Sequence, residues 1–327
     1  MQSTDPLKIL VTGATGSFGK TFVKTLLSEF PNATILAFSR DELKQFEMRA
    51  DFNSTRLDFM LGDVRDFGRV SQATSGVDII IHAAAMKQIP AAEQNPMEAI
   101  KTNILGAENI VNAALLNNVG RVIALSTDKA ANPANLYGAT KLCSDKLMIA
   151  GNYLSAEKKT KFSVVRYGNV LGSRGSVIPF FNEMKLKGSI PITDPRMTRF
   201  WLTLERGVEL VLTGLKTMQG GEIFVPKIPS FKVTDVARVV APGTPTHVIG
   251  IRPGEKLHEV MITEDDSMYT VEFENHYAIL SPQLLKISSS GKNSKMVPEG
   301  FSYRSDTNSW WHTDETFKTV LSEINLV

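Results

Sequence analysis

The chain has 327 residues and carries 36 basic and 34 acidic side chains, a formal net charge of +2. This length allows one large domain or two joined ones at roughly 150 residues each, and the balanced charge argues against a dedicated nucleic-acid binder, which carries a basic surplus. The single cysteine, Cys143, excludes an internal disulfide or a cysteine-rich metal site. No apolar run approaches the ~18 residues of a membrane helix, and residues 1–8 lack a signal-peptide pattern. We therefore expect a cytoplasmic protein without membrane contact.

Strand and helix patterns alternate through the first half of the chain. Short apolar, β-branched runs predict strands, and apolar residues at helical spacing predict helices between them. The strands are expected at 7–11, 33–38, 57–61, 77–82, 121–125 and 162–167, and the helices at 18–30, 41–50, 91–117 and 136–154. This alternation predicts an α/β fold with a doubly wound parallel sheet and right-handed crossovers.

The pattern becomes less regular after Gly168. Helices are expected at 174–188, 204–218 and 233–240, and a strand at 222–225 that returns to the sheet. Proline and glycine then cluster between 242 and 254, and residues 288–301 are polar with little periodicity. We expect residues 1–170 to form the sheet domain, with 195–240 partly returning to it. Residues 171–194 and 241–327 are expected to form a smaller substrate-binding lobe and tail.

A glycine-rich turn joins the first predicted strand to the first predicted helix. Residues 12–19 read TGATGSFG. Gly13 permits a tight turn, Gly16 lets a pyrophosphate approach the backbone, and Gly19 lets the helix pack closely on the strand. The helix N-terminus adds free N–H groups and a partial positive charge. Three spaced glycines alone are weak evidence for dinucleotide binding, because many turns contain glycine. Their position between a predicted strand and a predicted helix, however, predicts a Rossmann-type dinucleotide site.

The end of the second predicted strand bears on which dinucleotide is bound. An acid there bonds the ribose 2′-hydroxyl of NAD, whereas arginine suits the 2′-phosphate of NADP. The strand ends Ser39-Arg40, which favours NADP, although Asp41 and Glu42 follow directly. The alternative for Arg40 is a solvated surface arginine.

Two later strand ends complete the expected cofactor contacts. Asp63 and Val64 follow the third strand, where the adenine is expected. The small residues 83–85 follow the fourth strand and would let the cofactor lie against the backbone. His82, which ends that strand, fits a packing role better than a ligand or base.

Reactive side chains gather after the fifth predicted strand. Residues 126–129 read STDK, and Tyr137 and Lys141 follow at helical spacing, one turn apart on one face. A lysine ammonium beside a phenol lowers the tyrosine pKa, so Tyr137 could take a hydroxyl proton while hydride leaves the same carbon. An exposed helical pair is the alternative, since this spacing alone is common.

These segments resemble the extended short-chain dehydrogenase/reductases that act on nucleotide sugars. The likeness runs from about residue 7 to about 265 and weakens after about Ser281. The segments 83–88 (AAAMKQ), 126–129 (STDK), 166–170 (RYGNV) and 252–259 (RPGEKLHE) are more specific. They resemble the inverting UDP-N-acetylglucosamine 4,6-dehydratases, which catalyse the first step in the synthesis of pseudaminic acid. Pseudaminic acid is a sugar used in flagellin glycosylation.

The resemblance implies site residues, an NADP cofactor and a UDP-sugar substrate. The implied catalytic residues are Thr127, Asp128, Lys129, Tyr137 and Lys141. The implied cofactor-binding residues are Gly13, Thr15, Gly16, Ser17, Phe18, Gly19, Ser39, Arg40, Asp41, Lys44, Asp63, Val64, Ala83, Ala85, Lys87, Thr102, Asn103, Tyr137, Lys141 and Val170. The implied substrate-binding residues are Lys87, Asn169, Val177, Thr193, Arg252 and Glu255.

The implied reaction is a lyase reaction on an oxidoreductase scaffold. NADP oxidises C4 of the sugar, water is eliminated across C5 and C6, and hydride returns to C6. Asp128 would be the acid for the C6 hydroxyl and Lys129 the base at C5, where retaining relatives carry Asp-Glu. Lys129 must then be uncharged, and we expect the cationic nicotinamide and Lys141 to lower its pKa. The implied product is UDP-2-acetamido-2,6-dideoxy-β-L-arabino-hexos-4-ulose.

Two other classes of function remain open at this point. Another NAD(P)-dependent sugar epimerase or reductase would need no acid and base for elimination, so Asp128 and Lys129 argue against it. A non-catalytic dinucleotide sensor could lose Tyr137 or Lys141, and both are present. No spacing of histidine and carboxylate predicts a metal site. The family commonly pairs through the helices expected at 91–117 and 136–154, so a homo-oligomer is expected.

Overall fold

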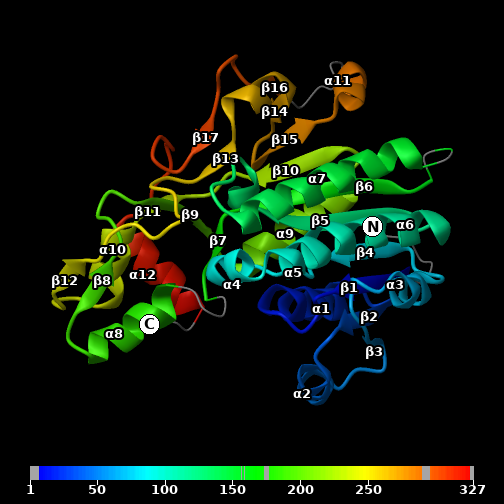
Figure 1. Ribbon diagram of the computed structural model, residues 1–327, viewed down its shortest axis with the longest axis horizontal. Helices are drawn as coiled ribbons and strands as arrows, with labels where there is room; N and C mark the ends of the chain where they lie inside the picture. Colours follow the sequence, from blue (N-terminus) through cyan, green and yellow to red (C-terminus); the bar gives the residue numbers. More distant parts are fainter. Residues whose placement is uncertain (1–6, 156, 158, 173–176, 289–294, 325–327) are drawn as a thin grey trace.

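A ten-stranded sheet forms the centre of the molecule, with most of its strands parallel (Figure 1). A computed structural model describes residues 7–155, 157, 159–172, 177–288 and 295–324. The strands, in sheet order, are β16 (Lys295–Met296), β14 (Thr270–Glu272), β15 (His276–Leu280), β10 (Glu222–Pro226), β6 (Lys161–Tyr167), β5 (Arg121–Thr127), β4 (Ile79–His82), β1 (Leu7–Thr12), β2 (Ala33–Ser39) and β3 (Leu57–Leu61). The run from β10 to β3 is parallel, and β15, β14 and β16 are antiparallel.

The order of the strands reverses between β1 and β4, which makes the sheet doubly wound as predicted. Right-handed crossovers in the two directions place helices on opposite faces. The helix α6 (Gly106–Leu116) contacts both α3 (Phe67–Thr74) and α7 (Leu136–Leu154), while α1 (Ser17–Glu29) contacts α9 (Leu204–Thr217) and α2 (Glu42–Phe52) contacts β3. The reversal leaves a crevice at the carboxyl ends of the strands, where ligands bind in such sheets.

The single helix expected over 91–117 is wrong, because the segment is divided. It contains α4 (Ile89–Gln94), α5 (Pro96–Ile100), a π-helical turn over Lys101–Leu105, and then α6. Pro96 has no N–H and disfavours a helical residue before it, and Asn95 accordingly has φ −130° and ψ 63°. The short helix α3 was not predicted.

A second, smaller core lies beside the sheet. The lobe around this core contains a parallel pair of strands, β8 (Ile190–Ile192) and the exposed β12 (Thr246–Val248), and the helices α8 (Val177–Leu186), α10 (Val233–Val240) and α12 (Asp314–Glu323). Phe181, Trp201, Phe231 and Phe317 fill this core, and the tail therefore packs on this lobe. The helix expected at 174–188 corresponds to α8, and residues 173–176 lie outside the described residues.

Of two further small sheets, the first contributes buried residues to both cores and the second to the larger core. One contains β11 (Ser230–Lys232), β9 (Thr198–Leu202) and β7 (Asn169–Val170), and the other pairs β13 (Val260–Ile262) with β17 (Tyr303–Arg304). A further helix, α11 (Pro282–Ser288), follows β15.

The chain divides between the two parts differently from the expected ranges. Residues 241–327 were expected in the lobe, but β14, β15 and β16 extend the central sheet. β15 pairs with β10 over five residue pairs and covers what would otherwise be an open edge of the parallel sheet.

None of the helices among the described residues has both the length and the apolar character that crossing a bilayer requires.

Candidate active site at the carboxyl edge of the sheet

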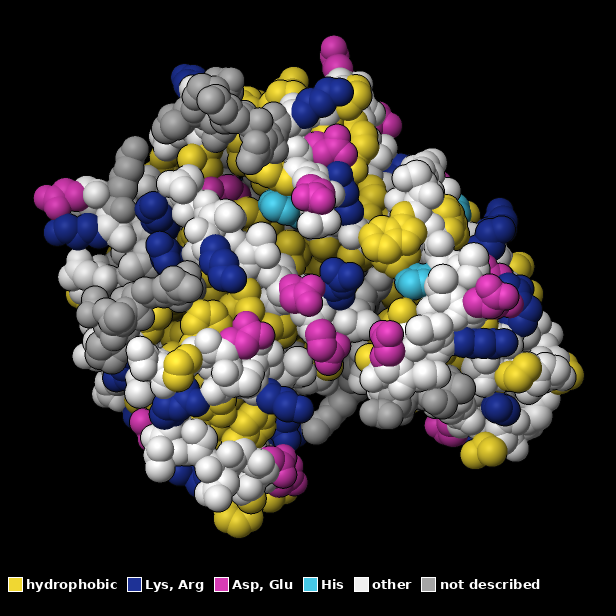
Figure 2. All heavy atoms as spheres, turned by 180° about the vertical axis from the view of Figure 1, so that it is seen from behind, with side chains coloured by type: hydrophobic (Ala, Val, Ile, Leu, Met, Phe, Trp, Pro, Cys, Tyr) yellow, Lys and Arg dark blue, Asp and Glu magenta, His cyan; other side chains and the backbone are white. Residues whose placement is uncertain are grey.

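A cavity of about 740 Å³ lies at the carboxyl ends of β1, β2, β4, β5 and β6. The glycine-rich turn lines one side, and Val177, Thr193 and Arg252 of the smaller lobe line another. The view from behind shows a notch in the surface between the smaller lobe and the body of the molecule (Figure 2). The cavity therefore lies where two parts of the chain could hold one ligand.

The glycine-rich turn leaves the start of α1 open toward the cavity. Gly13 has φ +66°, and a Cβ there would lie 2.8 Å from the backbone nitrogen of Ala84. A Cβ at Gly19 would lie 2.5 Å from the carbonyl oxygen of Ala14. Gly16 begins α1 without a side-chain cap, so the first N–H groups of the helix remain available to an anion. These features fit the pyrophosphate of a dinucleotide.

The residues at the end of β2 place an arginine in the wall of the cavity. Arg40 lines the cavity and its side chain is 59% exposed, with Nη1 3.6 Å from Oδ2 of Asp63. Asp41 accepts from the backbone N–H of Lys44, 3.0 Å away, and also pairs with the Lys44 amine. Ser39, Asp41 and Lys44 all line the cavity.

Asp63 does not line the cavity, in contrast to Val64 beside it. Its carboxylate accepts from Nε and Nη2 of Arg65, at 2.9 and 2.7 Å. Burial raises the pKa of Asp63, but the hydrogen bonds and charge of Arg65 outweigh burial and lower it. Its carboxylate is therefore engaged by arginines.

Asn103 is a second predicted cofactor residue that lies behind the cavity wall. It is buried in the π-helical turn, where its amide accepts from Met86 N (2.8 Å) and donates to Met86 O (2.9 Å). It also donates to Thr140 of α7. Asn103 thus fixes the loop after β4, and Ala83, Ala85, Lys87 and Thr102 line the cavity itself.

The side chains that follow β5 form a connected chain of hydrogen bonds. Thr127 Oγ1 donates to Oδ1 of Asp128 at 2.9 Å, and Thr127 also acts on the Tyr137 phenol, whose pKa it lowers. Lys129 Nζ donates to the same Oδ1 at 3.0 Å and to Oδ1 of Asn169 at 3.3 Å. Thr127, Lys129 and Tyr137 line the cavity, as does Lys141, while Asp128 lies behind it at 0% exposure.

The expected lowering of the Tyr137 pKa by Lys141 is wrong for this structure. Burial raises the pKa of Tyr137 to about 12, and the charge of Lys129 and the bond to Thr127 oppose that rise. Lys141 itself is buried, which lowers its pKa, and Asp145 opposes that shift. The cation that acts on the phenol here is Lys129.

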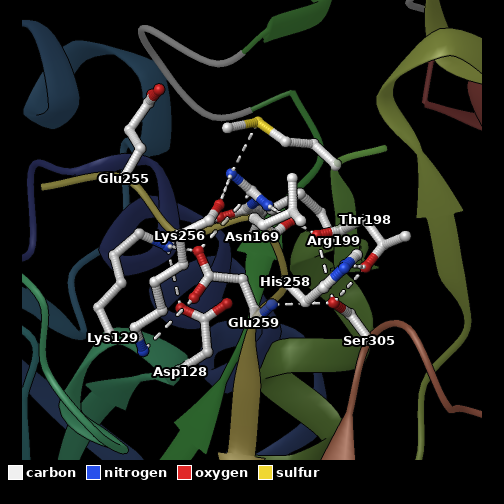
Figure 3. A network of polar contacts seen from close by, with 12 residues as sticks. Asp128, Lys129, Asn169, Thr198, Arg199, Glu255, Lys256, His258, Glu259 and Ser305 are labelled. Carbon is white, nitrogen blue, oxygen red and sulfur yellow. Dashed lines mark hydrogen bonds and ion pairs between the residues drawn. The ribbon is translucent and has the colours of Figure 1, made fainter. Parts of the chain in front are cut away.

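The expected lowering of the Lys129 pKa is also wrong. Burial lowers this pKa, but the negative charges of Asp128 and Glu259 outweigh burial and raise it. Nζ of Lys129 lies 3.4 Å from Oε1 of Glu259 (Figure 3). Without cofactor or substrate, the Lys129 amine therefore lies between the carboxylates of Asp128 and Glu259.

Three charged residues of the cavity wall were not predicted: Arg199, Lys256 and Glu259. Glu259 and Lys256 belong to the segment 252–259, on which the family resemblance partly rests. The sequence therefore pointed to this segment but gave no role to these two residues. Arg199 has no sequence signal, because its relation to this segment exists only after folding. Its guanidinium donates to the carbonyl oxygens of Lys256 (2.9 Å) and Leu257 (3.0 Å).

The predicted substrate residues all line the same cavity: Lys87, Asn169, Val177, Thr193, Arg252 and Glu255, together with Val170. Arg252 Nε donates to Oε1 of Glu255 at 2.9 Å. Burial lowers the pKa of Lys87. The residues come from both parts of the molecule, so a ligand that contacts all of them would span the crevice.

The doubly wound sheet, the open glycine cradle and the Tyr137–Lys141 helix define an extended short-chain dehydrogenase/reductase. Residues 9–281 match the family described as polysaccharide biosynthesis protein, and the chain belongs to this family. Among the described residues, no group of histidine, cysteine and carboxylate side chains could hold a metal ion.

Individual relatives agree with this assignment. The chain is 54% identical to the UDP-N-acetylglucosamine 4,6-dehydratase (inverting) of Campylobacter jejuni strain 81-176, over 96% of this chain and 97% of that protein. It is 42% identical to the UDP-glucose 4-epimerase of Rickettsia bellii, over 83% and 82%. The solved structure of Pen from Bacillus thuringiensis is 34% identical and covers 99% of both chains with a TM-score of 0.91.

Proposed function

We propose that this chain is a UDP-N-acetylglucosamine 4,6-dehydratase that inverts C5. Its product would be UDP-2-acetamido-2,6-dideoxy-β-L-arabino-hexos-4-ulose. The observation that carries the proposal is the Asp128–Lys129 pair: Lys129 lies in the cavity wall beside Tyr137 and donates at 3.0 Å to Asp128, which is buried directly behind it. The Campylobacter jejuni relative supports the substrate and the reaction.

The glycine cradle and Arg40 fit NADP, which supplies the acceptor and donor of hydride when bound. Gly13, Gly16 and the start of α1 would hold the pyrophosphate. The Arg40 guanidinium is exposed to the cavity and would hold the 2′-phosphate. Lys141 lines the cavity and is buried, so it would fix the nicotinamide side.

The residues after β5 would move the protons of the reaction. Tyr137 would take the proton of the C4 hydroxyl as the phenolate, the form that the charge of Lys129 and the neighbouring Thr127 favour. The resulting 4-ketone acidifies the C5 proton, which the Lys129 amine removes. Asp128 protonates the C6 hydroxyl, which leaves as water. Asn169, Arg252 and Glu255 would hold the sugar nucleotide across the crevice.

An epimerase is the second candidate, because the Rickettsia bellii relative has that activity in its name. Epimerisation at C4 needs Tyr137 and the dinucleotide but no acid and base for elimination. Asp128 accepts hydrogen bonds from Thr127 and Lys129, and these two residues line the same cavity as Tyr137. This arrangement supports the dehydratase.

The deciding experiment is incubation of the protein with UDP-N-acetylglucosamine and no added reduced cofactor, followed by mass spectrometry. A dehydratase yields a product lighter by one water, because its cofactor is regenerated. An epimerase yields a product of unchanged mass with a new sugar configuration. An unaltered substrate would exclude both activities.

We also propose that the enzyme acts in the cytoplasm as a homo-oligomer in pseudaminic acid-type synthesis. Large apolar side chains are exposed on α6 and α7, namely Leu116, Tyr153 and Leu154. Pairing through these helices would cover them, and light scattering of the purified protein measures the assembly. A monomer at micromolar concentration would contradict this part of the proposal.

A further inference from the structure

Glu259 brings a second carboxylate to Lys129 from a distant part of the chain. It directly precedes β13 and is only 2% exposed. Its Oε1 lies 3.4 Å from Nζ of Lys129 and 3.7 Å from Nε of Arg199, and its Oε2 lies 3.9 Å from Nζ of Lys256. Figure 3 shows the carboxylates of Asp128 and Glu259 side by side, with Lys129 next to them.

The position of Glu259 is fixed by bonds on several sides. Its backbone N–H donates to Oγ of Ser305 at 2.9 Å, and its carbonyl accepts from Ser305 N at 2.9 Å. Arg199 binds the carbonyl oxygens of the two residues Lys256 and Leu257, which lie just before it. Within the described residues, Oε2 of Glu259 is buried and has no hydrogen-bond partner. A buried carboxylate whose oxygen lacks a hydrogen-bond partner destabilises the folded state. Such a group calls for an explanation other than stability, for example a role in the reaction.

We propose that Glu259 is a positioning residue for Lys129, holding the amine between two carboxylates so that Lys129 and Asp128 share one proton. The inference rests on the proposed dehydratase function and deepens it. Glu259 does not touch the reacting sugar in this scheme. It acts through Lys129, whose amine it keeps at the cavity wall beside Asp128.

The shared proton supplies both the acid and the base of the elimination. When it moves from Nζ of Lys129 to Oδ1 of Asp128, an N–H bond breaks and an O–H bond forms, and no electrons are transferred. Lys129 is then a neutral amine and Asp128 a carboxylic acid. The amine takes the C5 proton, and the acid gives its proton to the departing C6 oxygen. The pair returns to ammonium and carboxylate, so this half-reaction needs no proton from solvent.

The charges around the pair determine the expected direction of the pH effect. Lys129 faces the anions Asp128 and Glu259, the cations Arg199 and Lys256, and the phenol of Tyr137. The pair titrates as a unit, and its active form carries one proton. Glu259 is negative and favours proton binding by both members. Its removal should move both limbs of the elimination pH profile to lower pH by about 1 unit.

The test compares wild type with Glu259→Gln, Glu259→Asp and the control Glu222→Gln. Gln keeps the shape of the side chain and removes its charge. Asp keeps the charge but is one methylene shorter, which moves the carboxylate away from Lys129. Glu222 is a buried carboxylate on β10, bonded to Ser163 and to the N–H groups of Gln219 and Gly220. The control therefore loses a buried negative charge away from the cavity.

Two measurements are made on each protein. The first is the pH profile of water loss from UDP-N-acetylglucosamine, followed separately from the oxidation of C4. The second uses the protein without substrate: trace acetylation of Lys129 against pH, read by peptide mass spectrometry with the exposed Lys216 as internal reference. Only a neutral amine is acetylated, so the midpoint reports proton loss from Lys129.

The proposal expects both midpoints to move to lower pH in Glu259→Gln, by about 1 unit, and by a smaller amount in Glu259→Asp. Glu222→Gln should leave both midpoints unchanged. Unmoved midpoints in a folded Glu259→Gln protein would overturn the proposal. If that variant does not fold, an unmoved midpoint in Glu259→Asp overturns it. Absence of water loss in wild type would instead reject the proposed function.

Discussion

The amine of Lys129 lies 3.0 Å from Oδ1 of Asp128, the preceding residue in the chain. A short 3₁₀ turn over Asp128–Ala130 makes this possible, because it curls the chain directly after β5. Thr127 caps the turn, with Oγ1 3.3 Å from the Lys129 N–H. Asp128 is fully buried while Lys129 lines the cavity, so one turn provides an inner carboxylate and an outer amine.

Lys129→Met should stop elimination and leave oxidation at C4 intact. The methionine keeps the apolar stem and removes the amine that would act at C5. Reduced cofactor should then accumulate and be visible by its absorbance, without water loss. In wild type, proton NMR of the product formed in deuterium oxide should show inversion and solvent deuterium at C5. Retention at C5, or full dehydratase activity of the variant, would contradict the assignment of Lys129.

The same variant should be less stable, with a specific pH dependence. Asp128 and Glu259 lose their shared cation, and breaking a buried pair costs about 3–5 kcal/mol. The pKa of Asp128 is already raised by burial and by Glu259, and it should rise further without Lys129. A carboxyl whose pKa is raised by folding contributes stability at low pH and loses it as pH rises. The destabilisation, measured by urea unfolding, should therefore shrink between pH ~7 and ~4.

Tyr137→Phe should slow oxidation at C4 by roughly 10²–10⁴-fold, the range for a positioned acid–base group. Sugar-nucleotide binding should change little, because the ring remains. Burial raises the pKa of Tyr137 to about 12, so the ring is a neutral phenol in the protein alone. Stopped-flow absorbance of the reduced cofactor measures the step. Turnover near that of wild type would mean that another group takes the hydroxyl proton.

Arg40→Ala should weaken NADP binding by about 1.5–3 kcal/mol, the range for a hydrogen bond to a charged group, and change NAD binding much less. Arg65→Ala is a matched control, because Arg65 also pairs with Asp63 but does not line the cavity. Calorimetric titration with each dinucleotide gives the comparison. An equal loss of binding free energy for NADP and NAD in Arg40→Ala would show that Arg40 does not bind the 2′-phosphate.

Gly138→Ala should impair the reaction without altering any reactive side chain. Gly138 follows Tyr137 in α7, and a Cβ there would lie 2.2 Å from the carbonyl oxygen of Lys129. The turn that carries Lys129 must move, at a cost of about 1–3 kcal/mol for overpacking. Gly207→Ala in α9 is the control, since its new Cβ would have 3.7 Å to its nearest neighbour, in Leu202. Turnover should fall only in the first variant, and an unchanged rate there would show that the turn tolerates displacement.

Much of the parallel sheet could be predicted because its signals are local. The third strand, Leu57–Leu61, and the helix Leu136–Leu154 have the expected bounds. The glycine turn was also readable, since each glycine meets a local steric need. The segment around Pro96 was misjudged, because apolar spacing continued through a residue that cannot continue a helix.

The sequence by itself determined the doubly wound parallel sheet, the dinucleotide cradle and the Tyr137–Lys141 helix, because short-range periodicity and backbone sterics specify each of them. Only the tertiary structure decided the charge around Lys129. Sequence reasoning predicted an amine with a lowered pKa, but folding brings Glu259 to 3.4 Å and the combined carboxylates raise that pKa. Coulomb energy depends on distance through space and on burial, and neither is encoded in the spacing of residues along the chain.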